Sequence, residues 1–302
     1  MDDLRRLAVF AAVVRHRSMS AAGRALGMSP SAVSQQVRLL EKDGGVTLLH
    51  RSTRKLTLTD AGERLHVACA AMVAQAELAR AELHSAREAP SGELRIAATV
   101  GFARHIAPAL GELLAAHSSL SLQLLVDDSP VDLIEARVDL AVRFGNVPDM
   151  PWAARRLGSF DWCLCASPQW LARHGEPASP EALLGHAWVG FARTGGVLIP
   201  SFRGPAGQQQ TLRIQPRIGS NNQLSIQQMC EAGLGPAMLG MVDVHEALDA
   251  GRLRHLLPEW QAGSLDVWAL TPQRDAQPAK VRHAIAALGR YLAGVPGMRP
   301  PG

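Results

Sequence analysis

Residues 18–38 read SMSAAGRALGMSPSAVSQQVR, and this stretch decides the fold of the N-terminal part of the chain. Its spacing of small and apolar residues is typical of a helix-turn-helix. Gly23 stands where two helices would cross, Gly27 stands in the turn between them, and Val33 faces the core. The other apolar positions hold Leu26, Met28 and Val37. The stretch therefore predicts a pair of helices that reads DNA.

The sequence on either side predicts a three-helix domain with a wing. A first helix is indicated by apolar residues at helical spacing, namely Leu4, Leu7, Val9, Phe10, Val13 and Val14. Ser20 is the expected cap of the second helix, and Ser29 caps the third, with Pro30 at its first position. Residues 46–60, VTLLHRSTRKLTLTD, contain two β-rich runs around a polar tip at residues 51–54, which predicts the wing.

The composition is that of an ordinary globular protein with room for two domains. The chain has 302 residues, of which 47% are hydrophobic, and a mean hydropathy of +0.02, which excludes a disordered or membrane-spanning chain. Up to Leu65 there are 11 Lys and Arg against 6 Asp and Glu, which leaves 20 against 21 for the rest of the chain. The net charge of +4 thus comes from the N-terminal fifth, where it would attract a phosphate backbone.

Two features bear on the cellular compartment. The cysteines, at positions 69, 163, 165 and 230, have neither zinc-site spacing nor the pattern of a secreted disulfide framework. Arg5-Arg6 and the apolar run after it resemble a signal peptide, but Asp2 and Asp3 oppose that interpretation, and Arg15-His16-Arg17 ends the run early. We expect a cytoplasmic protein that does not act at a membrane.

Residues 60–88 lack proline and are rich in alanine, which predicts one helix about 43 Å long. Its expected apolar stripe consists of Leu65, Ala68, Met72, Ala76, Ala79, Leu83 and Ala86. A small winged domain cannot cover a stripe of this length, so we expect a partner copy of the helix to cover it in a homodimer or homotetramer. The alternative is that the helix packs on the C-terminal domain of its own chain.

After a linker at residues 89–92, strands and helices alternate, which predicts an α/β domain with largely parallel sheets. The expected elements are the strands LRIAAT, SLQLLV and DLAVRF, a helix near 104–117, a short helix near Asp132 and a final helix near 278–292. Strand-rich material at 161–167 and 265–270 predicts two crossings between the lobes of a two-lobed domain with a cleft. The expected domains are a winged helix-turn-helix domain (1–59), a linker and dimerisation helix (60–89), and an effector-binding domain (90–302), with lobe I at 90–162 and 270–302 and lobe II at 163–269.

The polar face of the third helix supplies the candidate DNA-binding residues. A recognition helix presents its N-terminal residues to base edges, which here are Ser29, Pro30, Ser31, Ser34, Gln35 and Arg38. Gln35 suits adenine, and Arg38 suits guanine or a phosphate. On the wing, Arg51, Thr53 and Arg54 are expected at the phosphates. The alternative, a solvated helix face beside a charged hairpin, does not explain why these residues occur together with the turn and the wing.

The chain resembles the LysR-type transcriptional regulators over essentially its full length. The resemblance rests on LRRLAVFAAVVRHRSMSAAGRALGMSPSAVSQQVRLLE, on LLHRSTRKLTLTDAG, and on later segments such as DLAVRFG and NNQLSIQQMCEAGLG. It implies a winged helix-turn-helix, a dimerising linker helix and a two-lobed domain similar to periplasmic binding proteins. It also implies double-stranded promoter DNA, a small-molecule effector and RNA polymerase as partners. Departures from the family pattern occur at Gly44, Leu49, Pro236 and Gly240.

Candidate effector-binding residues follow predicted strands or precede predicted helices, where ligands of open α/β domains bind. They are Thr99, Val100, Gly101, Phe102, Arg143, Asn221, Asn222 and Gln223. These positions match the effector pocket that the resemblance implies, and their hydroxyl, amide and backbone N–H groups suit a small carboxylate or aromatic acid. For Arg143, a structural ion pair with a neighbouring acid is an equal alternative.

Other functions have weaker support in the sequence. Cys163 and Cys165 are expected in the core, whereas Cys230, on a helix near the cleft, leaves a thiol-based redox-responsive regulator as an alternative. A solute-binding protein is a more distant alternative, because the basic winged domain opposes it. The histidines show no metal-ligand pair, and the chain lacks both a nucleophile elbow and a P-loop, so we expect no catalytic residues, no metal, no cofactor and no enzymatic activity.

Overall fold

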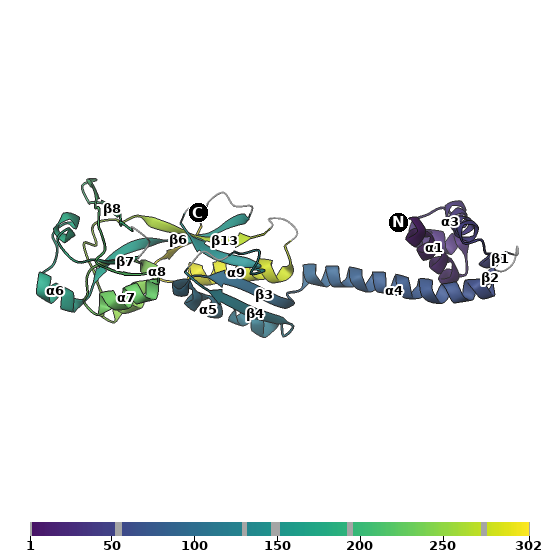
Figure 1. Cartoon of the computed structure of the whole chain (residues 1–302), viewed down its shortest axis with the longest axis horizontal. Coiled ribbons are helices and arrows are strands. Elements are labelled where there is room, and N and C mark those ends of the chain that lie inside the picture. The colour runs from purple at the N-terminus through teal and green to yellow at the C-terminus, as the bar shows by residue number, and fades with distance from the viewer. Residues whose placement is uncertain are drawn as a thin grey trace. The chain divides into compact units, whose positions relative to one another are not determined.

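The computed structural model describes residues 2–51, 56–128, 132–145, 152–191, 196–272 and 277–301 (Figure 1). The chain divides into two compact units, Met1–Ser85 and Ala86–Gly302. We call them the N-terminal unit and the regulatory unit. Among the described residues, no helix has the length and apolar character needed to cross a membrane.

The N-terminal unit contains the predicted three helices and wing. Helices α1 (Asp2–His16), α2 (Met19–Leu26) and α3 (Pro30–Gly44) are followed by strands β1 (Leu49–Arg51) and β2 (Leu56–Leu58), which pair antiparallel. The cap of α2 is Ser18, whose Oγ accepts from the Ala21 N–H at 3.3 Å, so the prediction of Ser20 is wrong. Ser18 has the extended backbone that a cap requires, whereas Ser20 already lies inside the helix.

Close packing of α2 on the turn explains the glycine at position 23. A Cβ atom there would lie 2.6 Å from the Met28 carbonyl oxygen, and Gly27 has a φ of 66°, the left-handed conformation that glycine adopts without strain. Val33 and Val37 are fully buried and Met28 packs against the same core, as predicted. Leu26 is 40% exposed, so its predicted core position is wrong.

The departures from the family pattern near the end of α3 are accommodated locally. The helix runs to Gly44, and Gly45 ends it with a φ of 63° and an N–H that bonds back to Glu41 and Lys42 carbonyls. The Glu41 Oε1 accepts from the N–H groups of Leu48 and Leu49, at 2.9 and 3.1 Å. Leu49 is buried. These bonds fix the start of the wing on α3.

Helix α4 spans Asp60–Glu88, the predicted range. Its first half packs on the core of the N-terminal unit through Leu65, Cys69 and Val73, whereas Ala68, which belongs to the predicted stripe, is exposed. The buried side is therefore rotated from the prediction. Val67, Leu78 and Leu83 are 72%, 58% and 75% exposed in the single chain.

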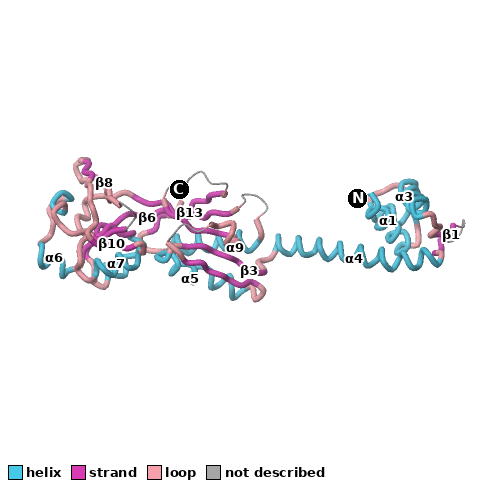
Figure 2. The backbone as a smooth tube through the Cα atoms, in the orientation of Figure 1, coloured by secondary structure: helices cyan, strands magenta, loops and turns pink. Residues whose placement is uncertain are grey.

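A mixed sheet forms the centre of the regulatory unit (Figure 2). Its strands are β3 (Gly92–Ala98), β4 (Leu120–Val126), β5 (Leu140–Phe144), β6 (Ala153–Ala166), β11 (Ala237–Gly240) and β13 (Ser264–Thr271), in the order β11-β6-β13-β5-β3-β4. The short strands β12 (Arg254–His255) and β14 (Met298–Arg299) also pair with β6. Helices α5 (Val100–Ala116) and α9 (Ala279–Ala293) share one apolar core with this sheet.

Smaller elements complete the regulatory unit. The helices are α6 (Pro168–His174), η1 (Pro180–Leu183), α7 (Gln223–Glu231) and α8 (Met241–Asp249). The strands are β7 (Val189–Phe191) with β10 (Ile218–Ser220), and the hairpin of β8 (Ser201–Arg203) with β9 (Gln209–Thr211).

Two predictions about the regulatory unit are wrong. The sheet is mixed, because β3 is parallel to β4 and β5, but β13 is antiparallel to both β5 and β6. The predicted helix near Asp132 is absent from the described residues that follow it, 132–139. Residues 133–137 form turns, with the Asp132 Oδ1 accepting from the N–H of Ile134 and Glu135, and Arg137, at a φ of 51°, ends them after one turn.

The contact at Gly23 predicts the effect of adding a single methyl group. We expect Gly23→Ala to lower the free energy of unfolding of the N-terminal unit by about 1–3 kcal/mol, because the new Cβ meets a backbone carbonyl that cannot move away alone. Gly44→Ala, with only Val46 Cγ1 at 3.7 Å, is the matched control and should be neutral or stabilising by up to about 1 kcal/mol. Urea unfolding of the full chain, with hydrogen exchange of α2 and α3, measures both, and equal stability of the two variants would contradict the packing argument.

Candidate nucleic-acid interface and ligand site

Helix α3 presents its predicted polar face to solvent. Ser29 caps the helix by accepting from the Ala32 N–H at 3.2 Å, and its Oγ lies 3.0 Å from the Oγ of Ser31. Pro30 occupies the first helical position. The exposed residues are Ser29, Pro30, Ser31, Gln35 and Arg38, and Ser34 is half-buried. Because Val33 and Val37 bury the opposite face, Gln35 and Arg38 point away from the core on consecutive turns.

The described part of the wing consists of β1 and β2, and its tip, residues 52–55, lies outside the described residues. Arg51 is the last residue of β1, and its register partner is Leu56. The side chain of Arg51 and the whole of Thr53 and Arg54 lie outside the described residues, so their expected phosphate contacts stay a prediction.

The candidate effector residues at 99–102 lie where β3 passes into α5. Thr99 occupies the cap position of α5 without a capping bond from its side chain, and the Val100 N–H donates instead to Asp128 Oδ1 at 2.9 Å. The Thr99 Oγ1 and the second carboxylate oxygen of Asp128 are both buried without a partner among the described residues. Two buried polar atoms at a helix N-terminus therefore remain available to a ligand.

The second candidate segment, residues 221–223, lies beside the first. A Cβ atom on Gly101 would lie 3.5 Å from Gln223 Cγ, so the N-termini of α5 and α7 are in contact. The Gln223 Nε2 is a third buried polar atom without a partner in the described chain. Asn222 caps α7 by accepting from the Ser225 N–H at 3.0 Å, whereas Asn221 is exposed. Within the described chain, the Gln223 Nε2 can therefore donate to a ligand, whereas the Asn222 Oδ1 already accepts the capping hydrogen bond.

Two other candidates lie apart from this cluster. Phe102 is buried in the core, with its ring 5.6 Å from that of Phe144. Val142 and Phe144 face the same core, so Arg143, between them on β5, faces the other side of the sheet. There burial lowers the pKa of Arg143 and the Asp127 carboxylate raises it. This environment favours the alternative of a structural charge interaction for Arg143.

The sequence analysis did not single out two carboxylates near the cluster. A Cβ atom on Gly101 would lie 3.7 Å from Asp243 Oδ1, and burial raises the pKa of Asp243 to about 6, against the opposing effects of Arg104 and His245. Asp128 is the second residue after SLQLLV, so its place close after a predicted strand was a usable signal. Asp243 had none, because its position depends on α8 meeting α5. The site therefore combines hydrogen-bond donors with carboxylates.

All four cysteines are free and buried. Cys163 and Cys165 lie in the core of the regulatory unit, as predicted, with their sulfur atoms 3.2 Å apart. Burial raises the pKa of Cys230 to about 12, whereas hydrogen bonds from Cys165 and His255 lower that of Cys163 to about 6. Among the described residues, no group of His, Cys, Asp and Glu side chains could hold a metal ion.

Two family comparisons together cover most of the chain. Residues 4–63 match the family described as bacterial regulatory helix-turn-helix protein, lysR family. Residues 87–293 match the family described as LysR substrate binding domain. The match to the first family contains the helix-turn-helix and the wing, and the match to the second contains the ligand cluster.

Individual relatives match over nearly the full length. The HTH-type transcriptional regulator PtxR of Pseudomonas aeruginosa is 33% identical over 97% of this chain and 94% of its own. The HTH-type transcriptional regulator DmlR of Escherichia coli K12 is 35% identical over the same shares. The full-length structure of the Vibrio cholerae virulence activator AphB, a member of the LTTR protein family, has a TM-score of 0.72 at 26% identity and covers 95% of this chain and 99% of that one.

The raised pKa of Asp243 predicts a pH-dependent stability. Because the folded state binds its proton more tightly than the unfolded state, unfolding should become easier as pH rises from about 4 to about 6. Asp243→Asn removes the free-energy cost of ionising a buried carboxyl. It should therefore raise the free energy of unfolding by about 1–3 kcal/mol at about pH 7 and have little effect at about pH 4. Urea unfolding at both pH values measures the difference. Glu246→Gln, an exposed carboxyl on the same helix, is the control, and an equal effect of Asp243→Asn at both pH values would contradict the argument.

Proposed function

The chain belongs to the LysR family of bacterial regulatory helix-turn-helix proteins, and we propose that it switches transcription at a promoter when a small carboxylic acid binds its regulatory unit. It is a DNA-binding transcriptional regulator with an effector-binding domain. The observation that supports the proposal is the cluster of buried polar atoms at Thr99, Asp128 and Gln223 that have no partner among the described residues. Buried polar groups in proteins are usually hydrogen-bonded, so a cluster of unpartnered ones supports a polar ligand site at this place.

The cluster defines the chemistry of the effector. The N-termini of α5 and α7 and the Gln223 amide favour a carboxylate, which they would bind through N–H donors. The free oxygen of Asp128 needs a donor from the ligand. A hydroxy or amino acid of small size, with or without an aromatic ring, supplies both groups. We propose this class, and we propose that Thr99, Val100, Gly101 and Gln223 form the contact and that Asn221 and Asn222 border it. Phe102 and Arg143 lie apart from the cluster, so we propose that Phe102 packs in the core and that Arg143 interacts with Asp127.

We propose that α3 reads the promoter through Gln35 and Arg38. Their side chains leave the helix on its exposed face, and Ser29, Pro30, Ser31 and Ser34 set the N-terminal end that approaches the groove. Arg51, Thr53 and Arg54 are proposed at the phosphates, which adds affinity without sequence preference.

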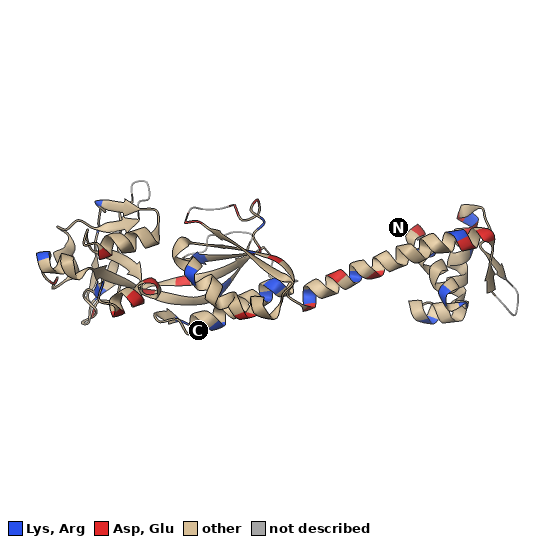
Figure 3. Cartoon of the chain, turned by 90° about the horizontal axis from the view of Figure 1, so that it is seen from below, with Lys and Arg blue, Asp and Glu red and all other residues tan. Residues whose placement is uncertain are grey.

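The proposed domain limits are residues 1–59, 60–89 and 90–302, with α4 as the dimerisation element. Val67, Ala71, Ala74 and Leu78 are exposed and spaced by four, three and four residues, which is the spacing of a helix-pairing face. Figure 3 shows acidic and basic residues alternating along the second half of α4, so neither sign of charge opposes pairing with a second copy. This face replaces the stripe that the sequence predicted, part of which the chain buries itself.

We propose that the effector acts by closing the lobes, which rotates the paired α4 helices and changes the separation of the two recognition helices. An effector can shift this equilibrium only if it binds one arrangement more tightly, by a few kcal/mol. RNA polymerase at the promoter, in the cytoplasm, would respond to the altered contact. Unchanged small-angle scattering and an unchanged footprint length in the presence of an active effector would contradict this mechanism.

The redox alternative has no support at Cys230. This thiol is fully buried and its pKa is raised to about 12, so little reactive thiolate forms near neutral pH. The small-carboxylate effector therefore remains the preferred signal.

A pull-down of genomic DNA with the purified full chain tests the regulatory function, followed by a salt titration on the best site. A two-fold related site before one or a few operons is expected, and the enzymes of those operons would nominate the effector. Binding that is salt-sensitive but indifferent to sequence would contradict a specific regulator.

Gln35→Ala tests the recognition helix. We expect a loss of about tenfold or more in affinity for the specific site and little change on scrambled duplex, because the amide contacts a base edge. Lys42→Ala, exposed in the last turn of the same helix, is the matched control and should retain the preference for the specific site. Fluorescence anisotropy at fixed salt measures both. An equal loss on the two duplexes would show that Gln35 does not read the sequence.

Leu78→Asp tests the proposed pairing face. A buried carboxylate opposite its symmetry mate should move the protein toward the monomer, whereas Ala76→Asp, on the side of the originally predicted stripe, should leave the oligomer intact. Sedimentation of the full chain measures both. Dissociation by Ala76→Asp alone would favour the original stripe, and intact assembly in both variants would exclude α4 as the interface.

A further inference from the structure

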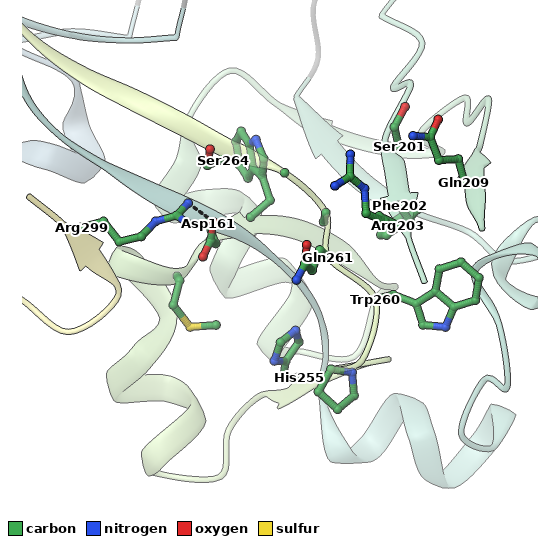
Figure 4. Close-up of a pocket in the computed structure, with 15 residues that line it drawn as sticks. Asp161, Ser201, Phe202, Arg203, Gln209, His255, Trp260, Gln261, Ser264 and Arg299 are labelled. Atoms are coloured by element: carbon green, nitrogen blue, oxygen red, sulfur yellow. Dashed lines mark hydrogen bonds and ion pairs between the residues drawn. The ribbon is translucent and has the colours of Figure 1, made fainter. Parts of the chain in front are cut away.

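A pocket of about 540 Å³ lies in the regulatory unit, and none of the candidate effector residues lines it (Figure 4). Its walls come from β6, β8, β9, α8, β12, β14 and the segment from Pro258 to Ser264 at the start of β13. A volume of this size falls within the range of small-molecule sites, which is about 300–1,000 Å³.

The pairing of β6 explains why the pocket exists. The ladder of β13 on β6 stops at the pair Ser264–Asp161, and β12 resumes at His255–Cys165. Between these two ladders the connecting segment leaves the sheet and opens a space over Trp162. The Trp162 N–H still donates to the Gly263 carbonyl at 3.0 Å.

The walls are held by backbone hydrogen bonds. Arg203 on β8 and Gln261 exchange two N–H to carbonyl bonds, each 2.9 Å long, which ties the β8–β9 hairpin to the connecting segment. On the other side an ion pair joins Arg299 of β14 to Asp161. Because these contacts join groups of the protein itself, they hold the walls in place, and binding loses little free energy to ordering them.

Positive charge exceeds negative charge in the lining. Asp161 is the carboxylate in it, and Arg299 is bound to this residue. Arg203 is exposed, and within the described part of the chain its guanidinium has no hydrogen bond or ion pair. In Figure 4 this guanidinium points from β8 toward the side where Ser264 and Gln261 lie.

His255 lines the pocket as a titratable side chain. A hydrogen bond with the Cys163 thiol raises the pKa of His255, and the nearby Glu259 raises it further against the opposing effect of burial. Cys163 lies beneath it in the core. The imidazole thus holds a proton more readily than an ordinary histidine, and its N–H groups can donate to a ligand in the pocket.

Apolar and aromatic side chains complete the lining. They are Trp162, Phe202, Met241, Pro258, Trp260 and Ala262. The aromatic rings and the Met241 sulfur favour a ligand with a planar apolar part. The hydroxyl and amide groups of Ser201, Gln209 and Gln261 can donate hydrogen bonds to the ligand.

We propose that this pocket is a second ligand site, distinct from the effector cluster, that binds an aromatic carboxylate with its anionic group at Arg203 and its ring against Trp260. The pocket joins Asp161 and Arg299, in the proposed lobe I, to Arg203 and His255, in the proposed lobe II. Its occupant bridges the two lobes.

Calorimetric titration of the full chain with 2-naphthoate tests the proposal, without relying on DNA binding or on the effector cluster. We expect saturable binding and much weaker binding of the neutral 2-naphthalenemethanol. Arg203→Gln should weaken naphthoate binding by about tenfold or more, because it removes the charge that meets the carboxylate. Arg213→Gln, an exposed arginine of the same hairpin region outside the pocket, is the matched control and should bind as the parent protein does.

Gln223→Leu separates this pocket from the effector cluster and should leave naphthoate binding unchanged. Loss of binding in Gln223→Leu with binding retained in Arg203→Gln would place naphthoate in the effector cluster and overturn the proposal. Equal binding of the alcohol, or no saturable heat up to about 5 mM naphthoate, would overturn it as well.

Discussion

The regulatory unit depends on one continuous strand. β6 pairs with β13 and β14 through its first part and with β11 and β12 through its second. A strand shared in this way couples the two proposed lobes of the regulatory unit. Closure of one lobe on the other would therefore bend β6 together with β13. The ladder between β6 and β13 contains one irregularity. Gly158, where a Cβ would lie 2.6 Å from the Arg299 carbonyl oxygen, faces Val267, and the register of the ladder shifts between Val267 and Trp268.

Local constraints made the N-terminal unit predictable from sequence. Gly23 and Gly27 are required by one close contact and one left-handed turn, and both lie within a few residues of the groups they meet. The limits of α4 follow equally from composition. The prediction of Ser20 as a cap failed because two serines lie a residue apart, and only the backbone angles decide between Ser18 and Ser20. The mixed sheet was missed because β13 pairs with strands more than a hundred residues earlier, and local pattern carries no strand direction.

The ligand cluster was only partly predictable, for a related reason. Position after a strand identified Thr99 and Gly101, and position before a helix identified Gln223, but only the packing of α5 on α7 brings them together. Strand alternation, which the sequence does contain, moves Arg143 to the other face of the sheet from Phe102. The pocket beside Arg203 had no local signal at all, because it arises where two ladders on β6 stop.

The same strand makes the two proposed sites interdependent. The effector cluster lies where α5, α7 and α8 meet, and α8 follows β11, whose Gly240 pairs with Trp162 of β6. The second pocket lies over Trp162. A ligand in either site that prefers one curvature of β6 changes the affinity of the other, and by linkage the factor is identical in both directions. A preference of about 1.4 kcal/mol in each site gives a coupling of up to about threefold in a two-state equilibrium, which makes the second ligand a modulator of the first. The geometry of β6 therefore sets how strongly two different acids compete or cooperate in one regulator.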